Sequence, residues 1–182
     1  MRFSFIFGAL ILFAGACSTQ PSYRDGKVPL ATAPSVDLDR YMGKWFEIAR
    51  LPNSFEKNCE GVTAEYALDE GQKVRVINTC RKGSIDGKID VAKGRAKVVD
   101  QQTNAKLKVS FFGPFWGDYW ILKIADDYSL SIVGEPQGKY LWILSRTPKI
   151  SDAVRDEALA KLQSLGYDTS ALYFTKQAAV AG

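Results

Sequence analysis

The 182-residue sequence contains no histidine. Without histidine the chain cannot form a Ser-His-Asp or Cys-His nucleophile pair, or a zinc site with an imidazole ligand. The side chain whose ordinary pKa lies closest to neutrality is also missing, so acid–base catalysis would depend on carboxylates, tyrosines or lysines. These absences exclude most hydrolase and metalloenzyme classes. No metal site, cofactor or catalytic residue is predicted.

The sequence also lacks a dominant charge sign and a long hydrophobic run. Its 24 Lys and Arg residues against 20 Asp and Glu residues give a net charge of +4, too weak to predict a nucleic-acid partner. The apolar stretch Phe3–Phe13 is shorter than the ~20 residues that a membrane-spanning helix needs. With 46% hydrophobic residues, the chain has the composition and length of one folded domain.

Residues 1–16 have the layout of a secretory signal, with Arg2 ahead of the apolar stretch and three small residues at its end. Cys17 follows directly, and the arrangement resembles a bacterial lipobox. It predicts a lipidated Cys17, and Ser18 in place of an aspartate favours the outer membrane, facing the periplasm. Plain secretion with a free cysteine is the alternative.

The rest of the chain divides by composition. Residues 18–36 are rich in Pro, Ser, Thr and Ala and show no periodicity, which predicts a flexible tether. We therefore expect four segments: a signal over 1–16, a lipidated N-terminus and tether over 17–36, a barrel domain over 37–176 and a disordered tail over 177–182.

From residue 43 onward, short β-rich runs alternate with Gly, Asp and Asn turns. The predicted strands cover 44–51, 62–68, 73–80, 94–101, 106–112, 119–125, 129–134 and 140–145. A helix follows, with Ser151 as its N-cap, Gly166 as its stop, and an apolar stripe of Val154, Ala158, Leu162 and Leu165. A ninth strand is expected over 171–176. The order predicts an all-β fold, an eight-stranded antiparallel up-and-down barrel with one C-terminal α-helix outside.

The register of the hairpin between 62–68 and 73–80 links two further predictions. With a turn centred between Asp69 and Glu70, Cys59 faces Cys80, which predicts a disulfide in an oxidising compartment, with free thiols as the alternative. The same register pairs Arg75 with Ala64. Arg75 would then point inward toward a carboxylate or phosphate, and a solvated arginine on the barrel wall is the equal alternative.

Three motifs resemble those of the lipocalins. Gly43-Lys44-Trp45 is similar to their G-x-W signature. Asp126-Asp127-Tyr128 lies where they carry a T-D-Y-like motif, with Asp126 as a departure, and Arg146 ends the eighth strand as in their third motif. With the stretches VTAEYAL, LKVSFFGPFWGDYW and YLWILSRTPKISD, residues 37–176 resemble the bacterial outer-membrane lipoprotein lipocalins, which are apolipoprotein D-like.

The resemblance implies structural roles for Gly43, Trp45, Asp127, Tyr128 and Arg146. Trp45 would plug the narrow end of the barrel with Arg146 stacked on its indole, a cation–π contact worth ~0.5–2 kcal/mol.

Strand alternation, supported by the resemblance, assigns the residues that face the lumen. The assigned set is Ala64, Tyr66, Arg75, Ala96, Val98, Leu107, Val109, Phe111, Tyr119, Ile121, Tyr140 and Trp142. Leu141 and Ile143 should pack outside, under the helix. The small residues Ala49, Ala64 and Ala96 favour a hollow interior, and a solid core is the alternative.

Such a lumen would suit a long acyl chain. The resemblance implies a membrane-anchored protein that binds fatty acids or lysophospholipids for storage or transport in envelope maintenance. The alternatives are a structural envelope lipoprotein with a filled barrel, and a lipocalin-scaffold enzyme using Glu47, Tyr66 or Tyr119 as proton carriers.

The connection 112–117 should lie at the open mouth, with Phe55 at the same rim. Its aromatic residues could pack on one another as a lid, or form a rim where lipid enters or a second subunit docks as a homodimer.

Overall fold

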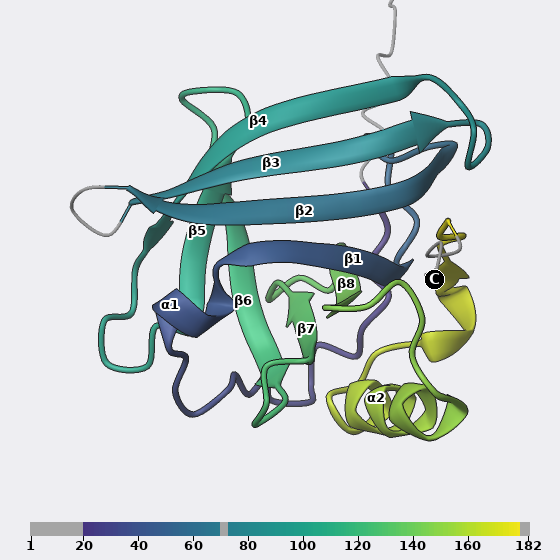
Figure 1. The fold of residues 1–182 in the computed structure, drawn as a ribbon. Helices are drawn as coiled ribbons and strands as arrows, with labels where there is room; N and C mark the ends of the chain where they lie inside the picture. The colour runs from purple at the N-terminus through teal and green to yellow at the C-terminus, as the bar shows by residue number, and fades with distance from the viewer. Residues whose placement is uncertain (1–19, 70–72, 179–182) are drawn as a thin grey trace, which may run out of the picture.

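The computed structural model describes residues 20–69 and 73–178, so the predicted signal, Cys17 and residues 179–182 lie outside these ranges. Within them the strands form one antiparallel sheet (Figure 1). The strands are β1 (Gly43–Arg50), β2 (Cys59–Asp69), β3 (Lys73–Lys82), β4 (Ile89–Val98), β5 (Lys106–Ser110), β6 (Gly117–Ile124), β7 (Leu130–Gly134), β8 (Leu141–Ser145) and β9 (Tyr173–Phe174). Consecutive strands pair from β2 to β8, and β1 pairs with both β2 and β8. The sheet therefore closes into an eight-stranded barrel, and β9 adds to the far end of β1.

Three short or medium helical segments complete the described part: α1 (Leu38–Tyr41), α2 (Asp152–Ser164) and the 3-10 turn η2 (Thr169–Ala171). The predicted fold class, a closed barrel with one C-terminal helix outside and a ninth strand, is confirmed. No helix within the described ranges is both long and apolar enough to cross a membrane.

Most strands lie within a few residues of their predicted bounds, but β4 begins earlier than expected. It was predicted over 94–101 and covers Ile89–Val98. Its first five residues are exposed, so no alternation of apolar and polar side chains marks them in the sequence. Backbone pairing with β3 holds them in the sheet, from Arg81 opposite Ile89 onward.

The predicted register between β2 and β3 is wrong. Ala64 lies opposite Asn78, and Arg75 lies opposite Ala67. The error is three residues, an odd number, so it turns the side chains of β3 to the opposite face of the sheet. Val74 and Val76 consequently pack in the interior, and Arg75 lies on the outer wall.

The predicted disulfide between Cys59 and Cys80 is confirmed, with 5.4 Å between their Cα atoms. Cys59 does not pair with Cys80 in the ladder, because its partner there is Lys82. A bulge after Glu60 brings the two cysteines together diagonally. Gly61 lies in this bulge with φ +56, a left-handed conformation that favours glycine.

Helix α2 packs on the outside of the barrel as the apolar stripe predicts. Its buried residues Ala158 and Leu162, with Leu165, join a cluster under the helix that contains Leu141 and Ile143. Ala49 belongs to this outer cluster too. The expectation that Ala49 leaves space in the lumen is therefore wrong.

Residues 20–36 follow the barrel wall instead of forming a free tether, which corrects the prediction for the described part of 17–36. The amides of Tyr23 and Asp25 donate to the carbonyls of Gly138 and Gly166. Further on, the amides of Ala33 and Val36, which are buried, donate to the carbonyls of Ile121 and Thr103. The Pro-rich composition hid this packing, because single buried residues leave no periodic pattern. We call residues 20–36 the strap.

At the other end of the chain, Gln177 also departs from the predicted disordered tail. Its side-chain amide donates to the carbonyls of Glu47 at 2.8 Å and Val62 at 2.9 Å. This contact attaches the end of the described chain to the barrel.

Trp45 closes one end of the barrel. It is fully buried, and its indole N–H donates to the Tyr41 carbonyl at 2.8 Å. The Arg146 guanidinium lies 3.8 Å from the Trp45 ring centroid, so the predicted stack is present. Arg146 also donates to the carbonyls of Arg40, Tyr41, Met42 and Lys44. One side chain thus ties the end of β8 to α1 and the start of β1.

The turn between β6 and β7 adds a second tie at this end. Asp127 accepts a hydrogen bond from the Ser129 amide at 2.9 Å, and Tyr128 takes a left-handed φ of 62°. The Tyr128 hydroxyl accepts from the Asp37 amide at 2.7 Å, and Arg40 lies 4.0 Å from its ring centroid. We call the opposite, open end the mouth; the connections β1–β2, β3–β4, β5–β6 and β7–β8 form it.

Replacing both Cys59 and Cys80 by serine should lower the free energy of unfolding by ~3 kcal/mol, because the bridge closes a loop between residues 21 apart. Urea denaturation of the oxidised protein and the double variant checks this. Adding a reductant should destabilise the natural protein by a similar amount and leave the double variant unchanged. A double variant as stable as the oxidised protein would contradict the expectation.

Candidate functional site

The barrel interior brings together nearly all of the side chains assigned to the lumen. Except for Arg75 and Tyr140, they belong to one hydrophobic cluster or pack against it. The fully buried members are Ala64, Tyr66, Ala96, Leu107 and Ile121, and the partly buried ones are Val98, Val109, Phe111, Tyr119 and Trp142. The side chains of this second group are only partly covered by the rest of the described chain.

Three tyrosines form a chain of hydroxyl groups above the closed end. Tyr119 lies in the middle, with its hydroxyl 2.8 Å from that of Tyr41 and 2.9 Å from that of Tyr66. Tyr41 continues the chain to the Ser131 hydroxyl at 3.3 Å. Burial raises the pKa of Tyr41 to about 12 and also raises the pKa values of Tyr66 and Tyr119 well above the usual range. These hydroxyls stay protonated and act as neutral hydrogen-bonding groups, which argues against Tyr66 and Tyr119 as proton carriers.

Asn78 is an interior polar group that the incorrect register concealed. It lies opposite Ala64 and Ala92 in the ladders, on the same face as Val74 and Val76. Its buried side-chain oxygen has no hydrogen-bond partner among the described residues. An unpaired buried acceptor is unfavourable, so Asn78 offers a hydrogen-bonding position on an otherwise apolar wall.

Gly94 makes room for an aromatic ring in the same wall. A Cβ atom on Gly94 would lie only 2.8 Å from the Phe111 ring, so any larger residue would displace Phe111. The glycine lets β4 and β5 bring Phe111 against the interior cluster.

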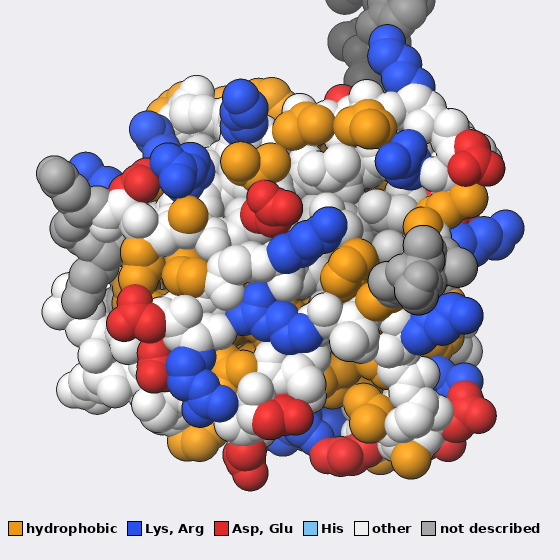
Figure 2. Space-filling model, in the orientation of Figure 1, with side chains coloured by type: hydrophobic (Ala, Val, Ile, Leu, Met, Phe, Trp, Pro, Cys, Tyr) orange, Lys and Arg blue, Asp and Glu red, His pale blue; other side chains and the backbone are white. Residues whose placement is uncertain are grey.

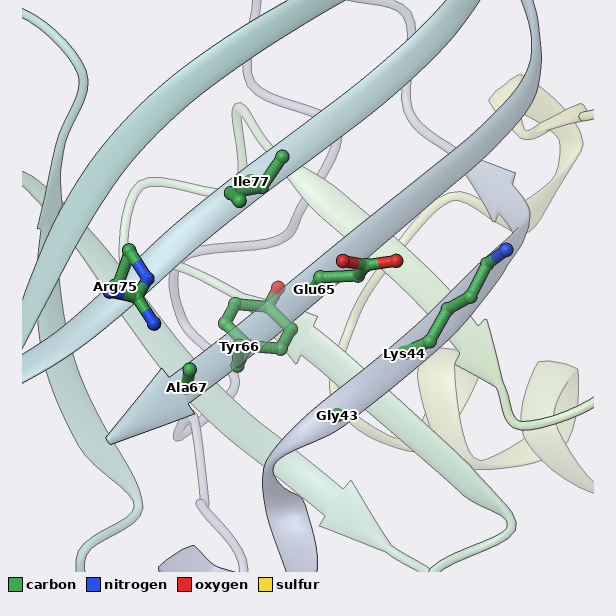
Figure 3. Close-up of a pocket in the computed structure, with 7 residues that line it drawn as sticks. All are labelled: Gly43, Lys44, Glu65, Tyr66, Ala67, Arg75 and Ile77. Carbon is green, nitrogen blue, oxygen red and sulfur yellow. The ribbon is translucent and has the colours of Figure 1, made fainter. Parts of the chain in front are cut away.

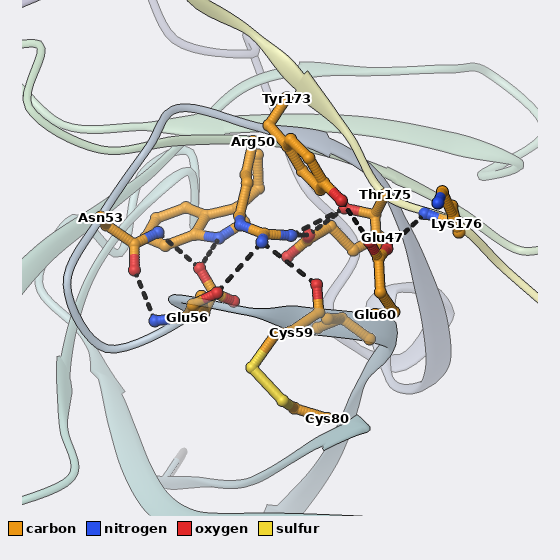
Figure 4. Close-up of polar contacts among 12 residues, drawn as sticks. Glu47, Arg50, Asn53, Glu56, Cys59, Glu60, Cys80, Tyr173, Thr175 and Lys176 are labelled. Carbon is orange, nitrogen blue, oxygen red and sulfur yellow. Dashed lines mark hydrogen bonds and ion pairs between the residues drawn. A yellow bond between two sulfur atoms is a disulfide. The ribbon is translucent and has the colours of Figure 1, made fainter. Parts of the chain in front are cut away.

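A buried polar cluster surrounds Arg50 near the mouth (Figure 4). The Arg50 guanidinium donates to the Glu47 carboxylate at 2.5 Å and to the Thr175 hydroxyl at 2.9 Å. It also donates to the carbonyls of Glu56 at 3.0 Å and Cys59 at 3.2 Å. The sequence analysis did not identify Arg50 as an interior residue. Its position at the end of an apolar strand was the available signal.

The Glu56 carboxylate joins this cluster to the lumen. It accepts hydrogen bonds from the Trp142 indole N–H at 3.0 Å and from the Asn53 amide at 2.6 Å. Arg50 thus forms an ion pair with the Glu47 carboxylate, and the buried carboxylates of Glu56 and Glu60 lie in the same cluster. Burial, together with the nearby Glu56, raises the pKa of Glu47 to about 8, against the opposing effect of Arg50.

The aromatic residues of the mouth fall into two groups. Phe55 packs against Tyr140 at 5.5 Å and Trp142 at 6.4 Å between ring centroids, and Tyr140 stacks on Trp142. The second group, Phe112 and Phe115, is 80% and 77% exposed. These two side chains therefore do not pack on one another as a lid, which removes one of the two predicted arrangements.

Arg75 lies outside the lumen. Its side chain is 57% exposed and 3.5 Å from the Asp69 carboxylate, so the alternative of a solvated wall arginine describes its position. It borders a shallow groove of about 170 Å³ on the outer wall between β1, β2 and β3 (Figure 3). The groove is lined by Gly43, Lys44, Glu65, Tyr66, Ala67, Arg75 and Ile77.

Comparisons of the sequence and of the structure with known proteins point to the same family. The family model described as a lipocalin-like domain matches residues 36–177. The outer membrane lipoprotein Blc of Escherichia coli K12 is 43% identical over 143 residues, covering 78% of this chain and 79% of the relative. The protein of the same name from Vibrio cholerae is 38% identical over 144 residues, covering 78% and 82%. The solved structure of insecticyanin from the tobacco hornworm Manduca sexta matches 88% of this chain and 89% of its own, with a TM-score of 0.69 and 25% identity.

Replacing Tyr119 by phenylalanine should lower the free energy of unfolding by ~1–3 kcal/mol, because two buried hydroxyls lose their shared partner. Tyr66→Phe should cost less, since Tyr66 is the last of the three tyrosines in the series and only its hydroxyl contact with Tyr119 is lost. Urea denaturation of both variants gives the comparison. Equal losses would contradict the central place of Tyr119.

The raised pKa of Glu47 predicts a pH dependence of stability. Below the ordinary glutamate pKa near 4.5, Glu47 is protonated in the folded and the unfolded chain, and no stability is lost. Between that value and about 8, only the unfolded chain loses the proton, so the free energy of unfolding should fall as pH rises. Glu47→Gln should remove this contribution, so its stability relative to the natural protein should improve from pH 5 to about pH 8. A difference that does not change with pH would show that Arg50 keeps Glu47 ionised.

Proposed function

Because this chain belongs to the lipocalin-like family, we propose that its barrel is a lipid-binding cup that is anchored to the outer membrane. The ligand class is a fatty acid or a lysophospholipid, held with its hydrocarbon tail inside the barrel. The role is storage or transport of such lipids in maintenance of the cell envelope, without a catalytic step.

The observation that carries this function is the graded burial of the interior. Trp45 and the tyrosine chain fill the closed end, whereas Val109, Phe111 and Trp142 toward the mouth remain only partly buried. Each methylene transferred from water to such a wall contributes ~0.8 kcal/mol. A dozen methylenes give roughly 10 kcal/mol before the costs of association and ordering, which is enough for binding without a specific polar contact.

The polar groups of the interior suit the head of such a ligand better than its tail. The Asn78 oxygen is an unpaired acceptor, and a lipid hydroxyl can supply the missing hydrogen bond. Arg50 is already surrounded by Glu47, Thr175 and two carbonyls. It is therefore a fixed part of the wall, and a carboxylate or phosphate head would remain at the mouth.

The location follows from the relatives and the N-terminus together. The Escherichia coli and Vibrio cholerae relatives are named outer membrane lipoproteins. The signal-like residues 1–16 and Cys17 support the same attachment here, through an acylated cysteine that faces the periplasm.

A structural lipoprotein with a filled barrel is the second candidate. The dense packing at the closed end, around Trp45 and the three tyrosines, favours it. An enzyme on this scaffold is a third candidate, in which Glu47 would be the proton carrier, because the raised pKa values of Tyr66 and Tyr119 argue against those two. The candidates differ in whether a lipid enters the barrel and whether it leaves chemically changed.

Titration of the protein with a fluorescent fatty acid tests lipid binding. We expect saturable binding, weakened about tenfold or more by Trp142→Ala or Phe111→Ala, because each removes ~2 kcal/mol or more of apolar contact. Phe174→Ala is the matched control, since Phe174 lies on β9 and is 45% exposed. This variant should bind the fatty acid like the natural protein.

The other outcomes separate the candidates. A folded protein that binds no fatty acid would support the filled structural barrel. Unchanged affinity in both lumen variants would show that the lipid binds elsewhere. Mass spectrometry of lipids that copurify from the protein's own membrane would identify the ligand, and a chemically altered ligand would indicate an enzyme.

A further inference from the structure

We propose that the barrel docks sideways onto an anionic lipid bilayer, through the outer wall of β3, β4 and β5 and the β5–β6 loop beside it. We call this surface the Trp116 face. It is distinct from the lumen and does not require that the barrel bind a lipid. Only its relation to an acyl anchor rests on the function proposed above.

Like charges lie directly opposite one another across this wall. Lys97 of β4 faces Lys73 on one side and Lys108 on the other, and Arg95 faces Arg75. Like-charged pairs at such positions destabilise a sheet. The repulsion is an intrinsic cost of the folded state, and an anionic surface laid against the wall would relieve it.

Few acidic groups neutralise the wall. Asp69 pairs with Arg75 at 3.5 Å, and Asp118 pairs with Lys108 at 3.0 Å. Lys93, Arg95 and Lys97 are exposed and take part in no ion pair among the residues that the structure describes. The wall therefore carries a surplus of positive charge on a broad convex surface, which suits an extended anionic partner better than a narrow one.

The β5–β6 loop adds apolar groups beside these cations. Trp116 is fixed on the wall, with its ring centroid 5.3 Å from the Arg95 guanidinium and 4.6 Å from the Lys97 ammonium. Phe112 and Phe115 of the same loop are 80% and 77% exposed. Exposed aromatic side chains next to lysine and arginine are typical of proteins that bind the headgroup region of a bilayer.

The charge distribution around the barrel gives this face a direction. Figure 1 shows α2 on the side of the barrel away from β3 and β4. In Figure 2 blue and orange side chains gather over β3 and β4 along the top of the molecule, and red ones gather along the bottom edge. Helix α2 carries Asp152, Asp156 and Glu157 against Arg155 and Lys161, so the two signs nearly cancel there. An anionic membrane would therefore attract the Trp116 face more strongly than the opposite side.

The start of the described chain lies beside the same face. Gln20 and Trp116 line one groove of about 340 Å³, and the Gln20 side chain donates to the Pro52 carbonyl. Cys17 precedes Gln20 by three residues, which can span at most about 11 Å. An acyl group on Cys17 would consequently enter the bilayer next to the Trp116 face.

Vesicle cosedimentation tests the proposal with the mature chain predicted to begin at residue 17, carrying Cys17→Ser, so that neither the apolar signal segment nor an acyl anchor contributes. The probes are vesicles of phosphatidylcholine alone and vesicles with about 30% phosphatidylglycerol. We expect much stronger binding to the anionic vesicles, and Lys93→Glu with Lys97→Glu should weaken it at least about tenfold. About 0.5 M salt should have a similar effect.

The matched control is Arg155→Glu with Lys161→Glu on α2, which changes the net charge by the same amount. Its vesicle binding should stay within about twofold of that of the Cys17→Ser protein without charge reversals. The Lys93/Lys97 variant should melt at the same temperature as the unreversed chain or higher, because it removes repulsion. Phe112→Ser with Phe115→Ser should weaken binding to both vesicle types.

Equal loss in the two charge-reversed variants, or no preference for anionic vesicles, would overturn the proposal. A concentration-dependent dimer that Phe112→Ser and Phe115→Ser abolish, without any vesicle binding, would assign the face to a second copy instead. None of these outcomes depends on fatty-acid binding, so the lumen and the Trp116 face are tested separately.

Discussion

The Arg146 guanidinium on the Trp45 ring is the contact on which the rest of the barrel depends. It lies directly after the eighth strand, and it donates hydrogen bonds to carbonyls at the start of the first strand. A closed barrel needs one pair of neighbouring strands that are distant in sequence, here β1 and β8. The Arg146–Trp45 stack lies at this pair and also covers the closed end of the barrel.

At the opposite end the barrel uses polar groups in place of aromatic packing. Arg50, Glu47 and Glu56 are buried together, and such a cluster is tolerated only when its charges balance and its hydrogen bonds are complete. Contacts to Thr175 and Tyr173 bring the C-terminal segment into the cluster. The mouth is thus held by residues from β1, the β1–β2 connection and β9, whereas the Phe112 side of the rim remains exposed.

The predictability of the fold followed the strength of the local pattern. β5, β8 and α2 have clear periodicities, and the structure has them close to the predicted ranges. The start of β4 has no such pattern because it is exposed on both faces. The β2–β3 register was misjudged because the cysteines pair diagonally across a bulge, which a symmetric hairpin does not contain.

The candidate site was predictable to the same extent. Alternation identified the apolar wall, including Phe111 and Trp142. It failed for Arg75 and Asn78 because the faces of β3 were assigned from the incorrect β2–β3 register. Buried charged groups such as Arg50 and Glu56 cannot be found from hydrophobic periodicity at all, since their burial depends on partners far along the chain.

The strap has a consequence for the order in which the molecule is assembled. A chain that emerges from its N-terminus releases residues 20–36 first, yet Val36, Ala33, Tyr23 and Asp25 bind Thr103, Ile121, Gly138 and Gly166. The last of these partners appears only when nearly all of the barrel has been delivered. The strap is therefore the first segment available and the last to dock.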